Sequence, residues 1–195
     1  MAGHSSWTPV ISEVLARRGD RRFQAAVRRG IEPTTETYAY PFILPLLDDP
    51  NQYAPVLRAA AFAAWFPSIP PTPHGSKPKR LGRFFYEVSR ARASGGTGEP
   101  FRLDPTRPDA IGSRLQQLVN LDFEPACSML RSMLALSEGT NVPLDYYELT
   151  RTLLYWGHGT SDESRKSRNR LLRDYFGAFT PVPSVDTVPP AQDDA

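Results

Sequence analysis

The chain has 195 residues with 40% hydrophobic and 23% charged side chains, a composition typical of a globular protein that buries a core. Its longest apolar run, residues 59–66, is far shorter than the roughly 18 residues that a membrane span needs, so we expect no membrane segment. The net charge of +2 excludes a uniformly basic protein, and the single cysteine and the lack of a secretory signal pattern predict a cytoplasmic location.

The first half of the sequence is typical of helices separated by turns. Clean apolar and polar alternation bounded by hairpin dipeptides, the mark of strands, is nearly absent. Thr8-Pro9 and Asp20 mark helix starts. In chain order we expect helices at Pro9–Arg18 and Arg21–Arg29, short or kinked helix within Thr34–Leu47, helix at Asn51–Phe66, a proline-rich loop at residues 67–79, and helix from Leu81 to about Ala93.

The second half is more regular. The segment Thr106-Arg107-Pro108-Asp109 resembles a capping box, and an apolar stripe through Ile111, Leu115 and Leu118 follows it. Thr160-Ser161-Asp162-Glu163 is a second capping box. The expected helices are one from about Asp109 to Val119, Phe123–Ser137 capped by Asp122 and ended by Gly139, Leu144–Trp156, and a last one that runs through Phe179.

These elements predict an all-α fold of about eight or nine helices in two small consecutive bundles. Residues 1–94 form the expected N-terminal bundle, and the glycine-rich residues 95–105 form a linker. Residues 106–180 form the expected C-terminal bundle. Residues 181–195 hold four prolines, three aspartates and no aromatic residue, and we expect a disordered acidic tail there.

Motifs of enzymatic chemistry are missing. Residues 95–101 lack the third glycine and the preceding strand of a dinucleotide fingerprint, and neither a P-loop nor a Gly-x-Ser-x-Gly elbow occurs. Three dispersed histidines and one cysteine do not predict a zinc site. Cys127 lies on an apolar helical stripe, which favours a buried structural thiol over a nucleophile. Trp65 and Trp156 are expected to anchor the core. We therefore expect no enzyme, no metal and no cofactor.

With those motifs excluded, arginine is the residue type that most indicates a function. It supplies 20 of the 23 basic residues, which fits phosphate contact but is equally typical of a GC-rich genome. Residues 1–100 hold 13 basic and 8 acidic residues, whereas residues 101–179 hold 10 of each. A polyanion would therefore meet a locally basic surface. The densest run favours either nucleic-acid contact or a solvated helix face, and consists of Arg17, Arg18, Arg21, Arg22, Arg28 and Arg29.

A sparser pattern places single arginines on helices of apolar or small residues. Its members are Arg58, Arg114, Arg131 and Arg151. The packed helix restricts each arginine side chain, so that its guanidinium group can reach partners in few directions. Each is equally typical of an internal salt bridge, for which Glu124, Asp145 and Glu148 are available. Four of them on successive helices favour a shared track for phosphates.

Several of these segments resemble the CasB-type small subunit of the type I-E CRISPR Cascade complex. Val142-Pro143-Leu144-Asp145-Tyr146, then Leu149–Trp156 and Arg170–Phe176, resemble its C-terminal half. Val27-Arg28-Arg29, Val56-Leu57-Arg58 and Leu81-Gly82-Arg83 fit the same family. The resemblance runs from about Asp20 to Phe179, and it rests on the order and spacing of the pieces. The loop at 67–79 and the acidic tail depart from it.

The resemblance implies an all-helical, non-enzymatic subunit that sits in pairs in an RNA-guided surveillance complex. Its implied partners are the backbone and large Cascade subunits, a second copy of itself, and the CRISPR RNA complex with target DNA, which it contacts without reading sequence. The RNA–DNA duplex of an R-loop is about as stable as the DNA duplex that it replaces. Modest contacts to the displaced strand can therefore shift the equilibrium toward the open target DNA. The candidate contact residues are Arg28, Arg29, Arg58, Lys79, Arg80, Arg83, Arg114, Arg131 and Arg151.

Two other functions stay open at this point. In the first, the chain is a pure scaffold whose arginines pair with neighbouring protein subunits. In the second, it is a free-standing helical DNA-binding regulator, against which stands the lack of a compact helix-turn-helix pattern.

Overall fold

The computed structural model describes residues 7–93, 108–156 and 161–178. Within these ranges it contains helices and no β-strand, which confirms the all-α prediction. The α-helices are α1 (Thr8–Ala16), α2 (Arg21–Arg28), α3 (Tyr40–Ile43), α4 (Tyr53–Trp65), α5 (Leu81–Ala93), α6 (Ala110–Leu118), α7 (Phe123–Ala135), α8 (Tyr146–Leu154) and α9 (Asp162–Phe176). Four short 3-10 helices are η1 (Arg29–Ile31), η2 (Glu36–Tyr38), η3 (Leu44–Leu46) and η4 (Pro50–Gln52). None of the described helices has the length and apolar character to cross a bilayer.

Side-chain caps occur at the starts of α2, α6, α8 and α9. Asp20 accepts a backbone N–H group at the start of α2, as predicted. Helix α9 is capped by Ser161, one residue after the first residue of the predicted box, Thr160, which lies outside the described ranges.

Three more starts differ from the prediction, those of α1, α6 and α7. Asp122 precedes α7 as expected, but its side chain makes no cap hydrogen bond. The residue before α1 is Trp7, with no side-chain cap bond. Helix α6 is capped by Asp109, whose carboxylate accepts the N–H of Gly112 at 2.8 Å, and the predicted box residues 106 and 107 lie outside the described ranges.

The proline-rich residues 67–79 contain no helix, as expected, but they are attached to the helical body. The backbone N–H of Leu144 donates to the carbonyl of Pro70, and the N–H of Thr72 donates to the carbonyl of Leu144, both at 2.9 Å. The N–H of Lys79 donates to the carboxylate of Asp145 at 3.2 Å. Because Asp145 also caps α8, this residue fixes the loop to the start of that helix.

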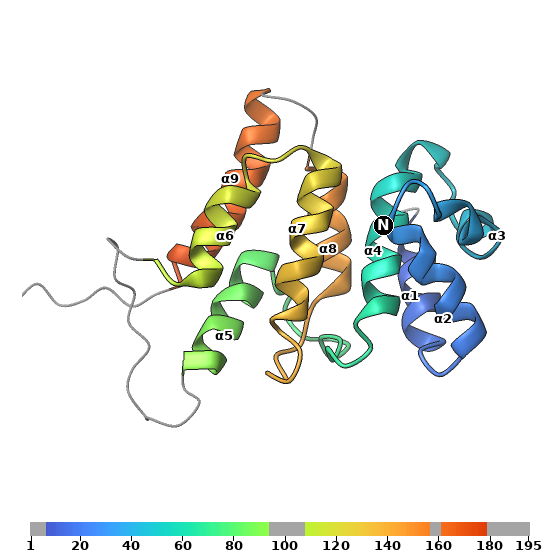
Figure 1. Cartoon of the computed structure of the whole chain (residues 1–195), viewed down its shortest axis with the longest axis horizontal. Helices are drawn as coiled ribbons and strands as arrows, with labels where there is room; N and C mark the ends of the chain where they lie inside the picture. Colours follow the sequence, from blue (N-terminus) through green and yellow to red (C-terminus); the bar gives the residue numbers. More distant parts are fainter. Residues whose placement is uncertain (1–6, 94–107, 157–160, 179–195) are drawn as a thin grey trace, which may run out of the picture.

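Figure 1 shows the helices side by side along the long axis of the molecule, with α1 to α4 at one end and α5, α6 and α9 at the other. Helices α7 and α8 lie between the two groups. Helix α4 is the centre of the first group, since it packs against α1 and α2 and also against α8. Its residues 56–64 are all buried, which explains its alanine-rich sequence.

The packing of α5 on α9 depends on Gly82. A Cβ atom at this position would lie 2.2 Å from the carbonyl oxygen of Leu171 and 2.8 Å from the Cβ of Asp174. Only glycine therefore permits this close approach of the two helices. Helix α5 lies in the predicted N-terminal bundle, yet it packs against α9 of the predicted C-terminal one. The division into two bundles stays a prediction, and its linker at 95–105 and its tail at 181–195 fall outside the described residues.

Candidate nucleic-acid interface

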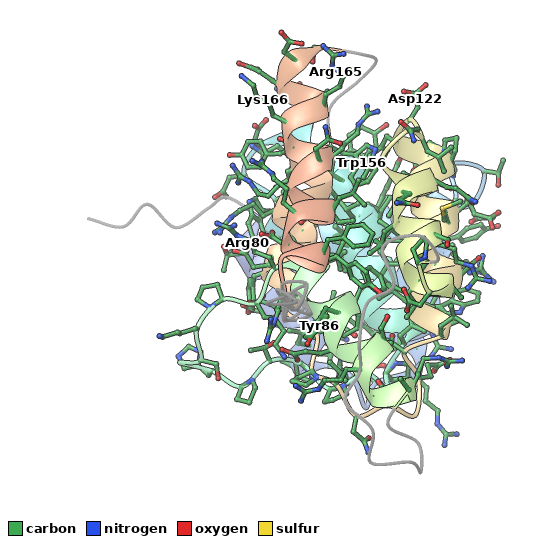
Figure 2. The ribbon with its side chains drawn as sticks, turned by 90° about the vertical axis from the view of Figure 1, so that its left-hand side faces the viewer. Arg80, Tyr86, Asp122, Trp156, Arg165 and Lys166 are labelled. Carbon is green, nitrogen blue, oxygen red and sulfur yellow. The ribbon has the colours of Figure 1, made fainter. Side chains whose placement is uncertain are left out.

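The close approach of α5 and α9 brings together basic residues that are far apart in the sequence. Leu171 and Tyr175 bury one face of α9, which leaves Arg170 and Arg173 exposed on the other. Arg80 and Arg83, at the start of α5, are exposed beside them. Figure 2 shows Arg80 next to the C-terminal half of α9. We call this the α5–α9 basic surface; its basic residues are Lys77, Lys79, Arg80, Arg83, Arg151, Arg170 and Arg173.

This surface contains two adjoining hollows. One has a volume of about 310 Å³ and is lined by Arg80, Arg151 and Arg170, among others. The second has a volume of about 600 Å³, and Lys77, Lys79, Arg83 and Arg173 contribute to it. Both include Arg80 and Asp174, so they form one continuous basic surface.

Acidic residues neutralise part of this charge. Glu87 accepts from Lys79 Nζ at 2.6 Å and lies 3.5 Å from Arg83 Nε. Asp174 pairs with Arg80 at 3.3 Å, and Glu148 pairs with Arg151. Seven basic side chains against three acidic ones leave a charge of +4. Within the described ranges, no carboxylate lies within ion-pair distance of Lys77, Arg170 or Arg173.

The chemistry of this surface suits a phosphate backbone. Guanidinium groups donate paired hydrogen bonds that match phosphate oxygens. The larger part of the surface carries no aromatic side chain, but Tyr155 lines the smaller hollow and is 67% exposed. An exposed ring beside cations is a platform on which a base of any identity stacks. The surface therefore offers backbone contact and base stacking without sequence readout.

Three other predicted residues gather at a second place, around Trp65. Arg131 lies over the indole ring with its guanidinium carbon 4.0 Å from the ring centre, and it pairs with Glu32 at 3.4 Å. Arg28 donates from Nε to the carbonyl of Ala64 at 2.7 Å. Two hollows of about 440 and 340 Å³ share Trp65 and Arg131. We call this group the Trp65 surface; it consists of Arg28, Arg29, Glu32, Trp65 and Arg131.

The exposure of Trp65 corrects the prediction that this residue anchors the core. The side chain is 38% exposed, whereas Trp156 is 1% exposed and is a core residue as predicted. Nearby, Arg29 lies over the exposed ring of Tyr38, 4.2 Å from its centre. Stacked arginine and aromatic side chains at a surface are typical of protein-binding sites.

Arg58 forms internal salt bridges, one of the two alternatives that the sequence left open. Its side chain is 1% exposed. Nη1 donates to Glu36 at 2.7 Å and to the carbonyl of Gly30 at 2.6 Å, while Nε and Nη2 donate to the two oxygens of Glu124 at 3.2 and 2.9 Å. Burial lowers the pKa of Arg58, but the bonds to Glu124 and Glu36 outweigh it and hold the pKa above its ordinary value. Four of the five guanidinium N–H donors bond inside the protein and the side chain is buried, so this structure does not present Arg58 to a phosphate at the surface.

Arg114 and the dense arginine run do not join either surface as a group. Arg114 is exposed on α6 and lines none of the hollows described above. Arg17 pairs with Glu13 and Asp20, and Arg18 lies 5.3 Å from the ring centre of Tyr146. Arg21 and Arg22 are exposed. The run is therefore divided between internal packing and solvent, and only Arg28 and Arg29 reach the Trp65 surface.

Sequence reasoning missed Lys77, Arg170 and Arg173. The signal for the last two was available, because Lys166, Arg170 and Arg173 follow one another at spacings of four and three residues, which places them on one face of a helix. Lys77 carried no such signal, because the proline-rich loop has no helical register from which to infer its neighbours.

The described part of the chain contains no cluster of metal-ligating side chains, and its cysteine is buried. No three histidine, cysteine, aspartate or glutamate side chains among the described residues gather where they could hold a metal ion. Cys127 is 2% exposed, which confirms the buried thiol. Burial, followed by the nearby charge of Glu124, raises the pKa of Cys127 to about 12, so the thiol stays protonated and unreactive at neutral pH.

Comparison with known proteins gives consistent matches. The family model for the CRISPR-associated protein Cse2 matches residues 23–176. A Cse2-family protein from Thermus thermophilus is similar in structure, with a TM-score of 0.62 and 23% identity over 90% of this chain and 100% of that one. A structure of CasB from the same organism gives a TM-score of 0.61 and 22% identity over the same shares. A chain of a CRISPR RNA-guided surveillance complex gives 0.64 and 18% over 88% and 92%. These structures show a shared fold, and no curated protein sequence matches significantly.

Proposed function

The chain belongs to the Cse2 family of CRISPR-associated proteins, and we propose that it is a non-catalytic subunit of an RNA-guided CRISPR surveillance complex. Family membership confirms the resemblance found in the sequence. One structurally similar chain comes from such a complex, which supports the proposal. The single, buried thiol supports a reducing location, the cytoplasm.

Within this complex, we propose that the subunit holds the backbone of single-stranded nucleic acid, namely the displaced strand of the R-loop. The observation that carries this proposal is the α5–α9 basic surface, with a charge of +4 over two adjoining hollows. Opening the target duplex is close to balanced in free energy, so a few phosphate contacts shift the equilibrium toward the open state. Arg80, Arg83, Arg151, Arg170 and Arg173 supply those contacts.

A second role, contact with other protein subunits or a second copy of this chain, is favoured by the Trp65 surface. Its charge is lower, at three arginines against Glu32, and its exposed indole is stacked by Arg131. Trp, Tyr and Arg are the residues that dominate binding energy at protein interfaces. The scaffold alternative therefore applies to this surface, while the α5–α9 basic surface serves nucleic acid.

Binding of an oligothymidine to the isolated protein at several salt concentrations tests the proposal. Contact with about 4 phosphates predicts a log–log salt slope near −3, at about −0.7 per phosphate. Replacing Arg170→Ala and Arg173→Ala together should reduce the slope to about −1.5. The matched control, Arg21→Ala with Arg22→Ala, also removes two exposed arginines of one helix but should leave the slope unchanged.

The outcomes separate the alternatives. Equal losses in the two double variants would show a net-charge effect and would contradict a localised site. A flat salt response of the unaltered protein would favour the scaffold alone. Strong preference for one sequence would refute backbone contact. In the assembled complex, the Arg170/Arg173 variant should assemble normally but shorten the lifetime of the open target DNA.

A further inference from the structure

The polypeptide leaves the described structure inside the α5–α9 basic surface. Helix α9 ends at Phe176, and the next two residues, Gly177 and Ala178, line the same hollow as Lys77, Lys79 and Arg83. The 17 residues that follow, 179–195, contain Asp186, Asp193 and Asp194 and no basic residue. An acidic segment is therefore tethered at the edge of the α5–α9 basic surface.

We propose that residues 179–195 occupy the α5–α9 basic surface of their own chain until nucleic acid displaces them. The inference rests on the proposed function, because nucleic acid is the competitor that the segment holds off. Carboxylates of the segment take the positions of phosphates on Lys77, Arg170 and Arg173. These three cations have no carboxylate partner among the described residues, so they are the ones that an added acidic segment would neutralise.

Chain length permits this arrangement. An extended chain spans at most about 3.3–3.6 Å per residue, and Asp186 follows Ala178 by eight residues, which gives a reach of up to about 26–29 Å. Ala178 itself already lines the hollow, so far less is needed. Covalent attachment over so few residues gives the carboxylates an effective concentration in the millimolar range, at which weak surface ion pairs suffice for occupancy.

Charge also selects this surface over the other one. The α5–α9 basic surface has a charge of +4, whereas the Trp65 surface has +2 from three arginines and Glu32. The three aspartates of the segment are a sparser anion than a nucleic-acid backbone, which carries a charge on every nucleotide. The segment therefore yields to a strand that the complex presents, while it weakens adventitious binding of nucleic acid to the isolated subunit.

A zero-length carbodiimide, which joins a carboxylate to an amine in direct contact, tests occupancy without any nucleic acid. The chain has only three lysines: Lys77 and Lys79 lie in the basic surface, and Lys166 lies near the other end of α9 (Figure 2). In the full-length protein we expect Asp186, Asp193 or Asp194 to join Lys77 or Lys79 within one chain. The cross-link should disappear at 1 M salt, where the Debye length is about 3 Å. Lys79 with Glu87, 2.6 Å apart, is the internal positive control.

Three results of this experiment would overturn the inference while leaving the proposed function untouched. The first is no cross-link of the aspartates when Lys79 and Glu87 are joined. The second is equal joining to Lys166, which would show that the segment has no preferred position. The third is cross-links that occur only in covalent dimers, which would assign the segment to a neighbouring copy.

The competition itself is measured by the affinity of the full-length protein for an oligothymidine at low salt. The variant Asp193→Asn/Asp194→Asn should bind about fivefold more tightly, as expected for the loss of two surface ion pairs. The control Asp48→Asn/Asp49→Asn also neutralises two adjacent aspartates, which lie between η3 and η4. These two elements follow α3, which is at the opposite end of the molecule's long axis from α5 and α9 (Figure 1). It should change the affinity less than twofold, and equal gains in both variants would overturn the inference. If neither the variants nor the unaltered protein bind DNA, the proposed function fails, and the cross-links still decide occupancy.

Discussion

Replacing Arg58 by methionine tests the assignment of this arginine to the interior. Methionine keeps an unbranched stem of similar length but removes all donors. Glu36, whose side chain is only 9% exposed, would lose its bond to Nη1 and keep the hydroxyl of Tyr40, which donates to it at 2.6 Å. Glu124 would lose both of its bonds, but its side chain is 44% exposed and can turn to water. The cost therefore arises mainly at Glu36.

Removing one partner of a buried ion pair costs about 3–5 kcal/mol. For a chain of this size, each kcal/mol lowers the melting temperature by about 2–4 °C, so Arg58→Met should melt roughly 6–20 °C below the unaltered protein. The double variant Arg58→Met/Glu36→Gln removes the unpaired charge at the buried position 36, while the exposed Glu124 is solvated, so it should recover a large part of this loss. Arg131→Met is the control, because its partly exposed pair with Glu32 and its stacking on Trp65 together stabilise the fold by only about 1 kcal/mol.

Thermal unfolding followed by the helical circular dichroism signal gives these values, and DNA affinity is measured on the same samples well below the melting temperature. The folded fraction of Arg58→Met should bind an oligothymidine as the unaltered protein does. A variant that melts within about 2 °C of the unaltered protein but binds DNA weakly would refute the reasoning. It would place the guanidinium on a nucleic-acid track after all.

Gly82→Ala should separate α5 from α9 and lower stability by about 1–3 kcal/mol in a melt, because the new Cβ meets backbone atoms; an unchanged melt would contradict the close approach. Asp145→Ala should cost about 1–2 kcal/mol in urea unfolding, since Asp145 caps α8 and also accepts the N–H of Lys79, and Asp145→Asn should cost less. Burial raises the pKa of Cys127 to about 12, so its stabilising effect is complete below about pH 9 and is lost as the pH rises toward 12. A thiol reagent at pH 8 should label Cys127 only after unfolding, and rapid labelling of the folded protein would disprove its burial.

Local sequence determined the helices and several of their ends. Asp20 and Ser161 cap α2 and α9 because a short side-chain acceptor satisfies N–H groups within three residues of itself. Gly139 follows α7 with a φ of +78°, a conformation that glycine adopts without strain. The family was also accessible from sequence, because it depends on the order and spacing of such segments along the chain. Capping and periodicity are short-range properties, so neighbouring residues contain the information.

The roles of the arginines were decided only by the tertiary structure. Arg58, Arg131 and Arg151 have similar local sequences, yet their side chains are 1%, 36% and 53% exposed. Glu124, which binds Arg58, lies 66 residues away, and its position depends on where the fold places α7 relative to α4. Likewise, Arg80 and Arg170 share a hollow only because Gly82 lets α5 approach α9. The exposure and partners of a long charged side chain depend on contacts between distant segments, and the residues adjacent to it in the sequence do not fix those contacts.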